Sequence, residues 1–431
     1  MLYLGIDVGK NTHVAALLSS DLLVKHKKYD SCPVQKIENS RAGFTALLTI
    51  ICKQSSPDEC RVLLEHTGHY GFALEQFLQE NGICTYRMLA RKRYATNKTD
   101  THDARALAVL LYNQIELAIP LVNESERVHP LVPASASART LRGLVRHRYE
   151  LQHEATQRKN KLTAIADELF PELTVIYKDP NTESALALRD QYPTPADVVR
   201  AEIEDVCATR KRTQPSREQL LELQQLARQS IGTKDASRCI SLVFEQQLLS
   251  AELRLFREHI ARLDTMIEEI VSVSREGQIL TSFTGIGTTQ AGIILSNIGS
   301  IANYESIAKF RAYLGWSPRQ SQTGTTYDST SLNRAGNVLL KQTLYLIVLN
   351  AITYDPHWKA LYDRLVKQKC AFDARTGKYK GKMKVIGRVA GQLAGVIYTL
   401  LRKDYDLLAS VPPGTEPPAP TLYVVESKRR E

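Results

Sequence analysis

The sequence predicts an α/β plus α chain, in which an N-terminal α/β domain is followed by a long helical arm and a mainly helical C-terminal domain. Three observations predict this class. Short apolar runs alternate with helix-like segments over the first quarter of the chain, as they do in an α/β layer. Two long helical patterns with apolar seams come next, and at Gln278 a third composition begins, with glycines between helical segments. A chain of 431 residues is also expected to hold two or three domains.

The N-terminal elements are predicted from the spacing of apolar residues. The runs 2–8 and 14–18 are divided by the polar turn GKNTH and, together with the run 22–29, they indicate antiparallel strands. Further strands are expected at 61–65 and 83–89, and helices at 40–53, 71–82 and 100–113. All of these elements belong to the first predicted domain, residues 1–120.

The middle of the chain is predicted to be helical. Proline and serine gather over 121–138, which indicates a linker. The region 139–277 holds two long helical patterns, 139–168 and 236–273, whose seams fit either an antiparallel coiled-coil-like arm or two helices of an ordinary bundle. The segments expected after it are a third domain at 278–410 and a flexible, proline-rich tail at 411–431.

Composition narrows the class of function. A net charge of +10 favours a polyanionic partner. Seven scattered cysteines without a CxxC pair indicate reduced thiols, which argues against a disulfide framework or a zinc site. No run approaches the ~18 apolar residues of a membrane span, and no leader-like segment follows the first residues. We therefore expect a cytoplasmic protein with no membrane partner.

Four acidic residues are the candidate catalytic and metal-binding groups: Asp7, Glu65, Asp100 and Asp103. Each lies where an apolar run ends or a helix begins, so their carboxylates are expected to meet at one edge of a sheet. Clustered carboxylates suit Mg²⁺ or Mn²⁺, and two such ions can align the attacking and leaving oxygens of a phosphodiester. Taken singly, each acid also has an ordinary explanation as a turn residue, a surface carboxylate or a helix-capping group.

The motifs GIDVGK, LLEHTG and KTDTHDAR appear in this order and are similar to those of the DEDD transposases of bridge-RNA insertion sequences, a family that also includes the Piv DNA invertase. The resemblance extends from Tyr3 to Leu408. It implies a RuvC-like, RNase H-fold domain whose four acids bind Mg²⁺ or Mn²⁺, then a coiled-coil region and a transposase domain. Its weakest part, about 170–233, looks like an insertion.

The C-terminal motifs indicate contacts with nucleic acid. The segment 284–295, TGIGTTQAGIIL, resembles a helix-hairpin-helix element, in which glycines let backbone amides approach a phosphate. The alternative for this segment is a glycine-rich helix turn that binds no ligand. A basic loop follows residue 370, and its alternative is a lysine loop that contacts only solvent. The expected nucleic-acid contacts are Lys10, Gly285, Gly287, Arg319, Arg334, Asn337, Lys341, Lys378, Lys380 and Lys382.

The candidate nucleophile departs from the pattern of the family. Members typically carry a serine directly before the glycine that corresponds to Gly324, and that serine is the proposed nucleophile. Thr323 stands there in this chain, and Ser321 lies two residues earlier. Threonine has the same hydroxyl on a more crowded carbon. Thr323 is the favoured nucleophile, while Ser321 and an inactive chain remain alternatives.

The resemblance implies a function. Members use a structured noncoding guide RNA to choose double-stranded donor and target DNA, and they assemble as dimers or tetramers. The expected reaction is Mg²⁺-dependent strand cleavage and exchange through a covalent hydroxyl–DNA bond, in the bacterial cytoplasm at the nucleoid. Two alternatives stay open: a hydrolytic nuclease resembling Holliday-junction resolvases, and an inactive scaffold that binds nucleic acid.

Overall fold

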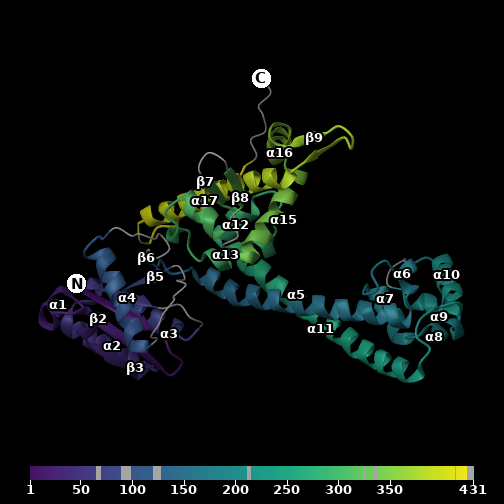
Figure 1. Ribbon diagram of the computed structural model, residues 1–431, viewed down its shortest axis with the longest axis horizontal. Helices are drawn as coiled ribbons and strands as arrows, with labels where there is room; N and C mark the ends of the chain where they lie inside the picture. Colours follow the sequence, from purple (N-terminus) through teal and green to yellow (C-terminus); the bar gives the residue numbers. More distant parts are fainter. Residues whose placement is uncertain are drawn as a thin grey trace. The chain divides into compact units, whose positions relative to one another are not determined.

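The structure is a computed structural model that describes residues 1–64, 69–88, 99–119, 128–210, 215–323, 327–332, 337–412 and 414–424. Of these, 87–88, 318–323 and 327–332 are described by their backbone alone. The chain divides into two compact units, Met1–Pro133 and Ala134–Glu431 (Figure 1). Each unit is considered separately below.

The first unit is built on a six-stranded sheet of order β3-β2-β1-β4-β5-β6. Its strands are β1 (Leu2–Asp7), β2 (Thr12–Leu18), β3 (Val34–Glu38), β4 (Cys60–Leu64), β5 (Cys84–Met88) and β6 (Val128–Pro130). The pairs β1–β4 and β4–β5 are parallel, whereas β1–β2, β2–β3 and β5–β6 are antiparallel. The predicted α/β domain is therefore present.

Helices cover both faces of this sheet because side chains alternate along each strand. Leu2, Leu4 and Ile6 point to one face, where they pack against α2 (Arg41–Gln54) and α3 (Phe72–Glu80). Tyr3 points to the other face, where α4 (Asp100–Ile115) supplies Leu107 and Leu111. The sheet is thus the middle layer of three.

The expectation of a strand over 22–29 is wrong, because residues 20–26 form α1 (Ser20–His26). The Ser19 side chain accepts the backbone N–H of Leu22 at 3.2 Å and caps the helix. Lys27, with a φ of 58°, ends it in the left-handed conformation. The strand that completes the antiparallel set is β3, which lies later in the chain and pairs with β2.

Two long antiparallel helices organise the second unit. α5 (Ala136–Leu169) and α11 (Ala236–Val273) lie side by side, and α11 has the bounds that its apolar pattern predicts (Figure 1). Ion pairs run along the contact, at 2.5 Å for Arg148–Asp264, 2.7 Å for Arg158–Glu252 and 2.6 Å for Arg238–Glu168. Because the numbers rise along one helix as they fall along the other, the pair is antiparallel.

The sequence between α5 and α11 forms five short helices, which pack around a core of their own. They are α6 (Leu173–Ile176), α7 (Glu183–Gln191), α8 (Pro195–Arg200), α9 (Ile203–Ala208) and α10 (Arg217–Arg228). Buried Arg189 of α7 connects these helices to α5 and α11, because it donates to Leu162 O at 2.7 Å and to Gln246 Oε1 at 2.9 Å. Burial lowers the pKa of this guanidinium to about 10.

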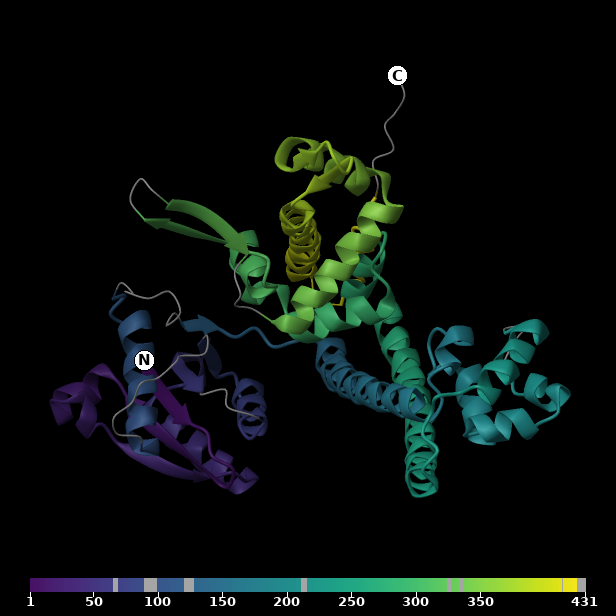
Figure 2. The same cartoon turned by 45° about the vertical axis from the view of Figure 1, so that its right-hand side comes forward.

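The remaining helices form the largest core of the chain, together with Leu141 and Val145 of α5 and Ile267 and Val271 of α11. They are α12 (Arg275–Thr281), α13 (Thr288–Ile298), α14 (Ile307–Tyr313), α15 (Val338–Tyr354), α16 (Pro356–Lys369) and α17 (Lys382–Ser410). A hairpin of β7 (Pro318–Thr323) and β8 (Tyr327–Leu332) projects from these helices (Figure 2). A second, shorter hairpin joins β9 (Ala371–Asp373) to β10 (Lys378–Lys380).

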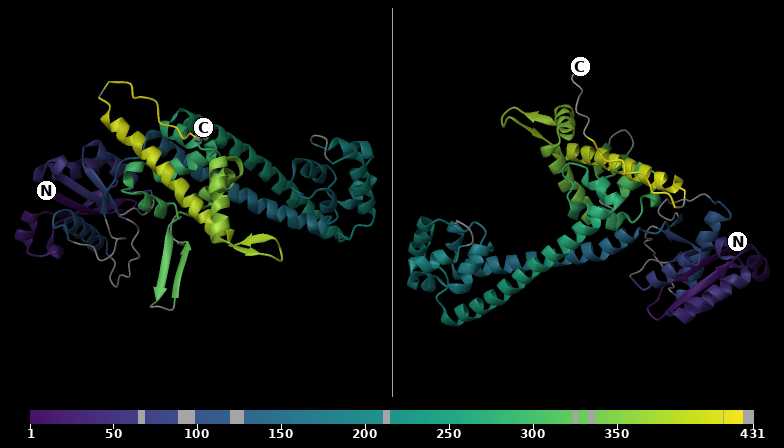
Figure 3. Two further views of the ribbon diagram at one scale, coloured as in Figure 1. Left: turned by 90° about the horizontal axis from the view of Figure 1, so that it is seen from above. Right: turned by 180° about the vertical axis from the view of Figure 1, so that it is seen from behind.

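After α17 the chain turns back along the C-terminal helices (Figure 3). Tyr423 stacks on Phe283 with 4.3 Å between ring centroids, and its backbone N–H donates to Ser282 Oγ at 2.9 Å. The carbonyl of Pro418 accepts from Arg275 at 2.8 Å. None of the helices in the described ranges has the length and apolar character needed to span a bilayer.

Candidate active site and nucleic-acid-binding residues

The close crossing of β1 and α4 depends on Gly5. A Cβ at this position would clash with the backbone of Ala104 and of Ala108, and would lie 2.7 Å from the Cβ of Leu107. The helix can therefore approach the strand this closely only because Gly5 has no side chain.

This crossing brings the end of β1 to the start of α4. Tyr3 contacts Tyr112 at 5.4 Å between ring centroids, and Gly5 contacts Ala104 and Ala108, so the helix runs opposite to the strand. Asp7 shares the face of Tyr3 and Gly5, because positions two apart in a strand point the same way. It is therefore directed toward the first turn of α4, which carries Asp100 and Asp103.

The acids of α4 differ in their surroundings. Thr99 caps the helix by accepting the N–H of His102 at 3.3 Å, which fixes where α4 begins. Asp100 is exposed, whereas Asp103 is only 4% exposed and lies 3.9 Å from Nδ1 of His102. At the far end of α4, the Tyr3 hydroxyl donates to Glu116 at 2.5 Å, and burial with this bond raises the pKa of Tyr3.

Three of the four predicted acids, Asp7, Asp100 and Asp103, lie within the described residues, and Glu65 lies outside them. No three His, Cys, Asp or Glu side chains among the described residues form a group that could hold a metal ion. By the chemistry of their donors, the carboxylates of Asp7, Asp100 and Asp103 fit a hard divalent cation. Lys10 is exposed in the turn after β1, and its carbonyl accepts from Asn39 at 2.9 Å.

The candidate nucleophiles lie on one strand of the β7–β8 hairpin. The backbone register pairs Ser321 with Ser329 and Thr323 with Tyr327, and it places Arg319 opposite Ser331. Ser321 and Thr323 are two residues apart on β7, so the two positions share one face of the hairpin. Gly324, which follows Thr323 in the sequence, lies outside the described residues, as does Arg334.

The glycine turn between α12 and α13 is closely packed. Gly285 has a φ of 95°, and its carbonyl accepts from Asn350 Nδ2 at 3.3 Å. A side chain there would meet the Cβ of Asn350 at 2.7 Å. The N–H of Gly287 donates to Gln290 Oε1 at 2.7 Å. Both glycines therefore have structural roles in the turn, and the Gly287 amide already has a partner.

Asn337 and Lys341 lie at the start of α15. The Asn337 side chain accepts the N–H of Leu340 at 3.1 Å and donates to Asn297 Oδ1 at 2.7 Å, so it caps α15 and ties it to α13. The carbonyl of Lys341 accepts from the Trp316 indole at 3.2 Å. These contacts explain both residues structurally and leave the expected role in nucleic-acid binding as a prediction.

The predicted basic loop is the β9–β10 hairpin and the first turn of α17. Lys378 and Lys382 are exposed. Lys380 is exposed too, but it pairs with Asp373 at 2.7 Å, and this contact lowers the pKa of the Asp373 carboxyl. Lysines in the first turn of a helix do not stabilise it, because the helix dipole favours anions there.

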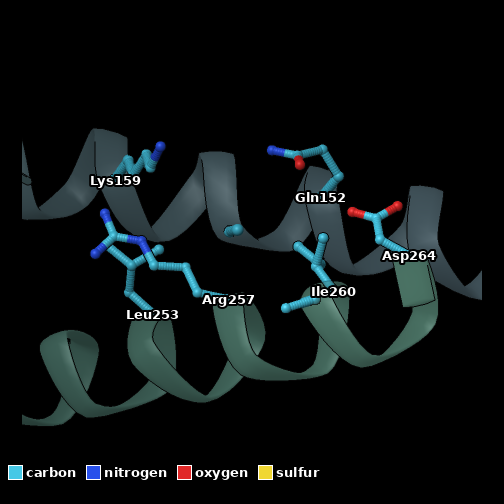
Figure 4. A pocket seen from close by; sticks show the side chains of 8 residues that line it. Gln152, Lys159, Leu253, Arg257, Ile260 and Asp264 are labelled. Carbon is cyan, nitrogen blue, oxygen red and sulfur yellow. The ribbon is translucent and has the colours of Figure 1, made fainter. Parts of the chain in front are cut away.

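A pocket of about 210 Å³ lies between α5 and α11 (Figure 4). Leu253 and Ile260 form its apolar part, while Lys159 and Arg257 supply charge. The carboxylate in its lining, Asp264, is held by Arg148. This pocket therefore offers no combination of groups suited to phosphodiester chemistry.

Sequence reasoning missed Gly5, which positions the acids. A glycine inside the apolar strand LYLGID was the available signal, because such a glycine often marks the close approach of another backbone. Sequence reasoning also missed Phe372, an exposed aromatic residue in the same hairpin as the predicted lysines. The sequence pointed to Phe372 only by placing it within a basic segment.

Comparison with known proteins identifies the family. Residues 4–171 match the IS110-type DEDD model described as "Transposase", and residues 277–363 match a model described as "Transposase IS116/IS110/IS902 family". The first match contains all four predicted acids, and the second contains Ser321 and Thr323.

Two curated proteins are similar to parts of the chain. An "Insertion element IS110 uncharacterized 43.6 kDa protein" of Streptomyces coelicolor is 24% identical over 168 residues, 39% of each chain. A "Probable family 20 transposase" of Pseudomonas aeruginosa is 29% identical over 96 residues, which is 22% of this chain and 28% of the relative. The matches thus span less than half of either relative. On the two family matches, the chain belongs to the IS110/IS116/IS902 family of DEDD transposases.

Proposed function

We propose that this chain is an RNA-guided DNA recombinase of a mobile insertion sequence, which cuts and rejoins strands through a covalent bond between a protein hydroxyl and DNA. The observation that carries the proposal is the crossing at Gly5, which directs Asp7 toward the helix turn of Asp100 and Asp103. Oxygen ligands gathered at a sheet edge suit a site for phosphodiester chemistry.

The proposed catalytic domain, residues 1–120, is RuvC-like with an RNase H-like fold. Support comes from the strand order, with an antiparallel β3-β2-β1 edge joined to parallel β4 and β5. Glu65 directly follows Leu64, whose register partner is Ile6, the residue before Asp7. We therefore include Glu65 with the other three acids as ligands of Mg²⁺ or Mn²⁺, which when bound would neutralise charge on the scissile phosphate.

The proposed nucleophile is the Thr323 hydroxyl, with Ser321 as the alternative. Its oxygen forms a bond to phosphorus while the bond from phosphorus to a deoxyribose oxygen breaks. The hydroxyl loses its proton, and the departing deoxyribose oxygen gains one. Attack by a deoxyribose hydroxyl of another strand then reverses the step, so the phosphodiester is retained without net hydrolysis.

The proposed partners are a structured guide RNA, donor and target DNA, and further copies of the chain. The net charge of +10 suits polyanions, and Arg319, Arg334 and Lys378 are among the cations assigned to them. A DNA substrate would place the reaction at the nucleoid. In this scheme 121–138 is a linker that nevertheless contains β6 and the first residues of α5. Residues 139–277 form a coiled-coil arm with an insertion at about 170–233, 278–410 the transposase domain with its helix-hairpin-helix-like turn, and 411–431 the tail.

An exposed apolar row on α11 supports self-association. Its members are Ile240, Phe244, Leu248, Leu255, Met266 and Val273, and successive members are separated by nearly whole turns of helix. The row lies opposite the side of α11 on which Leu242 and Leu253 pack against α5. We therefore assign the dimer contact to this row, since the seam between α5 and α11 is already filled within one chain.

The test is a trapped adduct. The full-length protein is purified with its bound RNA, the RNA is sequenced, and labelled DNA matching it is incubated with the protein and Mg²⁺. A labelled band that survives denaturation is expected for the wild type and for Thr323→Ser, and its loss is expected for Thr323→Ala.

Each other outcome has a defined meaning. If Ser321→Ala loses the adduct and Thr323→Ala keeps it, Ser321 is the nucleophile. Cutting without any adduct would support the hydrolytic nuclease instead. Binding of nucleic acid without cutting would support the inactive scaffold.

A further inference from the structure

The β9–β10 hairpin presents an aromatic pair at the surface. The strand register places Phe372 opposite Tyr379, so the two share one face, and their ring centroids are 5.1 Å apart. Tyr379 is half-buried against the core of the C-terminal helices, whereas Phe372 is 59% exposed. Tyr379 thus fixes the hairpin to the domain, and the Phe372 ring remains available to a ligand.

The segment that carries this ring is rich in cations. The segment 371–384 contains five basic residues and a single acidic one, Asp373. Of these cations, only Lys380 has an ion-pair partner in the described part of the chain. Arg375, Lys378 and Lys382 are exposed and follow Phe372 in the sequence by three, six and ten residues. An exposed aromatic ring among unpaired cations is complementary to a base attached to a phosphodiester backbone.

We propose that the β9–β10 hairpin binds single-stranded DNA, with one unpaired base stacked on Phe372 and its backbone held by Arg375, Lys378 and Lys382. This deepens the proposed function, because guide pairing and strand exchange both leave DNA unpaired. A base inside a duplex is covered on both faces by its neighbours, so the exposed ring has no stacking partner there.

The single carboxylate of the hairpin is already hydrogen-bonded. Asp373 is the one carboxylate available to accept a hydrogen bond from a ribose 2′-hydroxyl. Its oxygens already receive the Lys380 ammonium, the backbone N–H of Arg375 and the Thr376 hydroxyl. The Asp373 carboxylate is therefore engaged within the hairpin, and we take an unpaired DNA strand as the ligand.

The experiment measures binding of the full-length protein to a fluorescent single-stranded DNA of mixed sequence, to its duplex and to the matching RNA, without Mg²⁺. Phe372→Ala is expected to weaken binding of the single strand roughly tenfold, because stacking on an aromatic side chain contributes about 1–3 kcal/mol per base. Phe372→Trp should keep the affinity, and Phe372→Leu should lose it. Tyr354→Ala removes an aromatic ring that is 72% exposed in the same domain and is the matched control.

A purely structural role for Phe372 predicts different results. If Phe372→Leu binds as the wild type does, the ring only fills space beside Tyr379, and the proposal is overturned. It is also overturned if Phe372→Ala weakens the duplex equally, or if the Phe372-dependent affinity is greater for RNA. Thermal melting of Phe372→Ala should match the wild type, since the ring is largely exposed.

The assay involves no cleavage, so it separates this surface from the catalytic proposal. Normal strand binding by every Phe372 variant, together with a trapped adduct, would reject the hairpin and retain the recombinase. If single-strand binding depends on Phe372 but no adduct forms, the hairpin proposal is retained and the recombinase proposal is rejected.

Discussion

At the residue scale, Gly5 links the sequence to the candidate site. It has no Cβ, and the backbone of α4 occupies the space where a Cβ would stand. Two residues later on the same face of β1 is Asp7, and one residue before Ala104 is Asp103. A change at Gly5 therefore alters the separation between strand and helix, and with it the separation of the acids.

We expect Gly5→Ala to destabilise the first unit by about 3 kcal/mol or more, because the strand and helix must move apart. Chemical denaturation followed by circular dichroism measures the effect. Gly143→Ala is the matched control: Gly143 lies inside α5 with no neighbouring atom near its missing Cβ, so alanine should stabilise by up to about 1 kcal/mol. A neutral Gly5→Ala would mean that the helix does not approach β1 closely.

Asp7→Asn tests the proposed metal site. The substitution removes a negative oxygen ligand while keeping the size of the side chain. Saturating Mg²⁺ should raise the melting temperature of the wild type, since a ligand at ~100 times its dissociation constant stabilises by about 2.7 kcal/mol. The variant should gain much less, and should still bind nucleic acid. An equal Mg²⁺ effect in both proteins would remove Asp7 from the site.

At the element scale, long periodic patterns were predictable, and so were the short apolar runs that form β1, β2, β4 and β5, whereas the run 22–29 was not. The pattern over 236–273 gave the bounds of α11, because an apolar seam repeated over many turns has one simple interpretation. The run 22–29 has the composition of a strand, yet the capping side chain of Ser19 and the left-handed Lys27 bound a helix over Ser20–His26. Local capping outweighed apolar composition there.

The candidate site was predictable only in part. The start of α4 at Asp100 follows from the Thr99 cap, so two acids in its first turn could be foreseen. The approach of β1 to α4 depends on packing across a sheet, which no local pattern contains. Likewise, nothing in the proline-rich tail indicated that Tyr423 would stack on Phe283, because the contact joins distant parts of the sequence.

The tail contact yields a stability prediction. Tyr423→Ala removes a ring stacked on Phe283 and should lower the stability of the C-terminal helices by about 1–2 kcal/mol. Thermal melting with a fluorescence probe of Trp358 measures it, since this buried residue lies in the same core. Leu422→Ala, at the neighbouring residue that is 46% exposed, is the control. Equal melting of both variants would show that the tail contributes nothing to this core.

At the scale of the whole molecule, the apolar row of α11 predicts the behaviour of the assembly. A lysine at Phe244 would place a charge in the proposed contact of each copy, so Phe244→Lys should shift the protein to monomers. Light scattering after size exclusion, over a range of concentrations, measures the mass. Asn160→Lys adds the same charge at an exposed position of α5 and should leave the mass unchanged. A wild-type protein that is monomeric throughout, with and without nucleic acid, would reject the assigned contact.

The division of the chain into two units leads to the final prediction. Asp7 belongs to Met1–Pro133 and Thr323 to Ala134–Glu431, and the proposed mechanism requires both to act on the same phosphate. If different copies supply them, Asp7→Asn and Thr323→Ala should each abolish the adduct, while a mixture of the two restores part of it. In a mixed dimer, one site then combines intact acids from one copy with an intact hydroxyl from the other. Subunit exchange between the two variants is confirmed first. If the mixture then forms no more adduct than either variant alone, each copy assembles its own site.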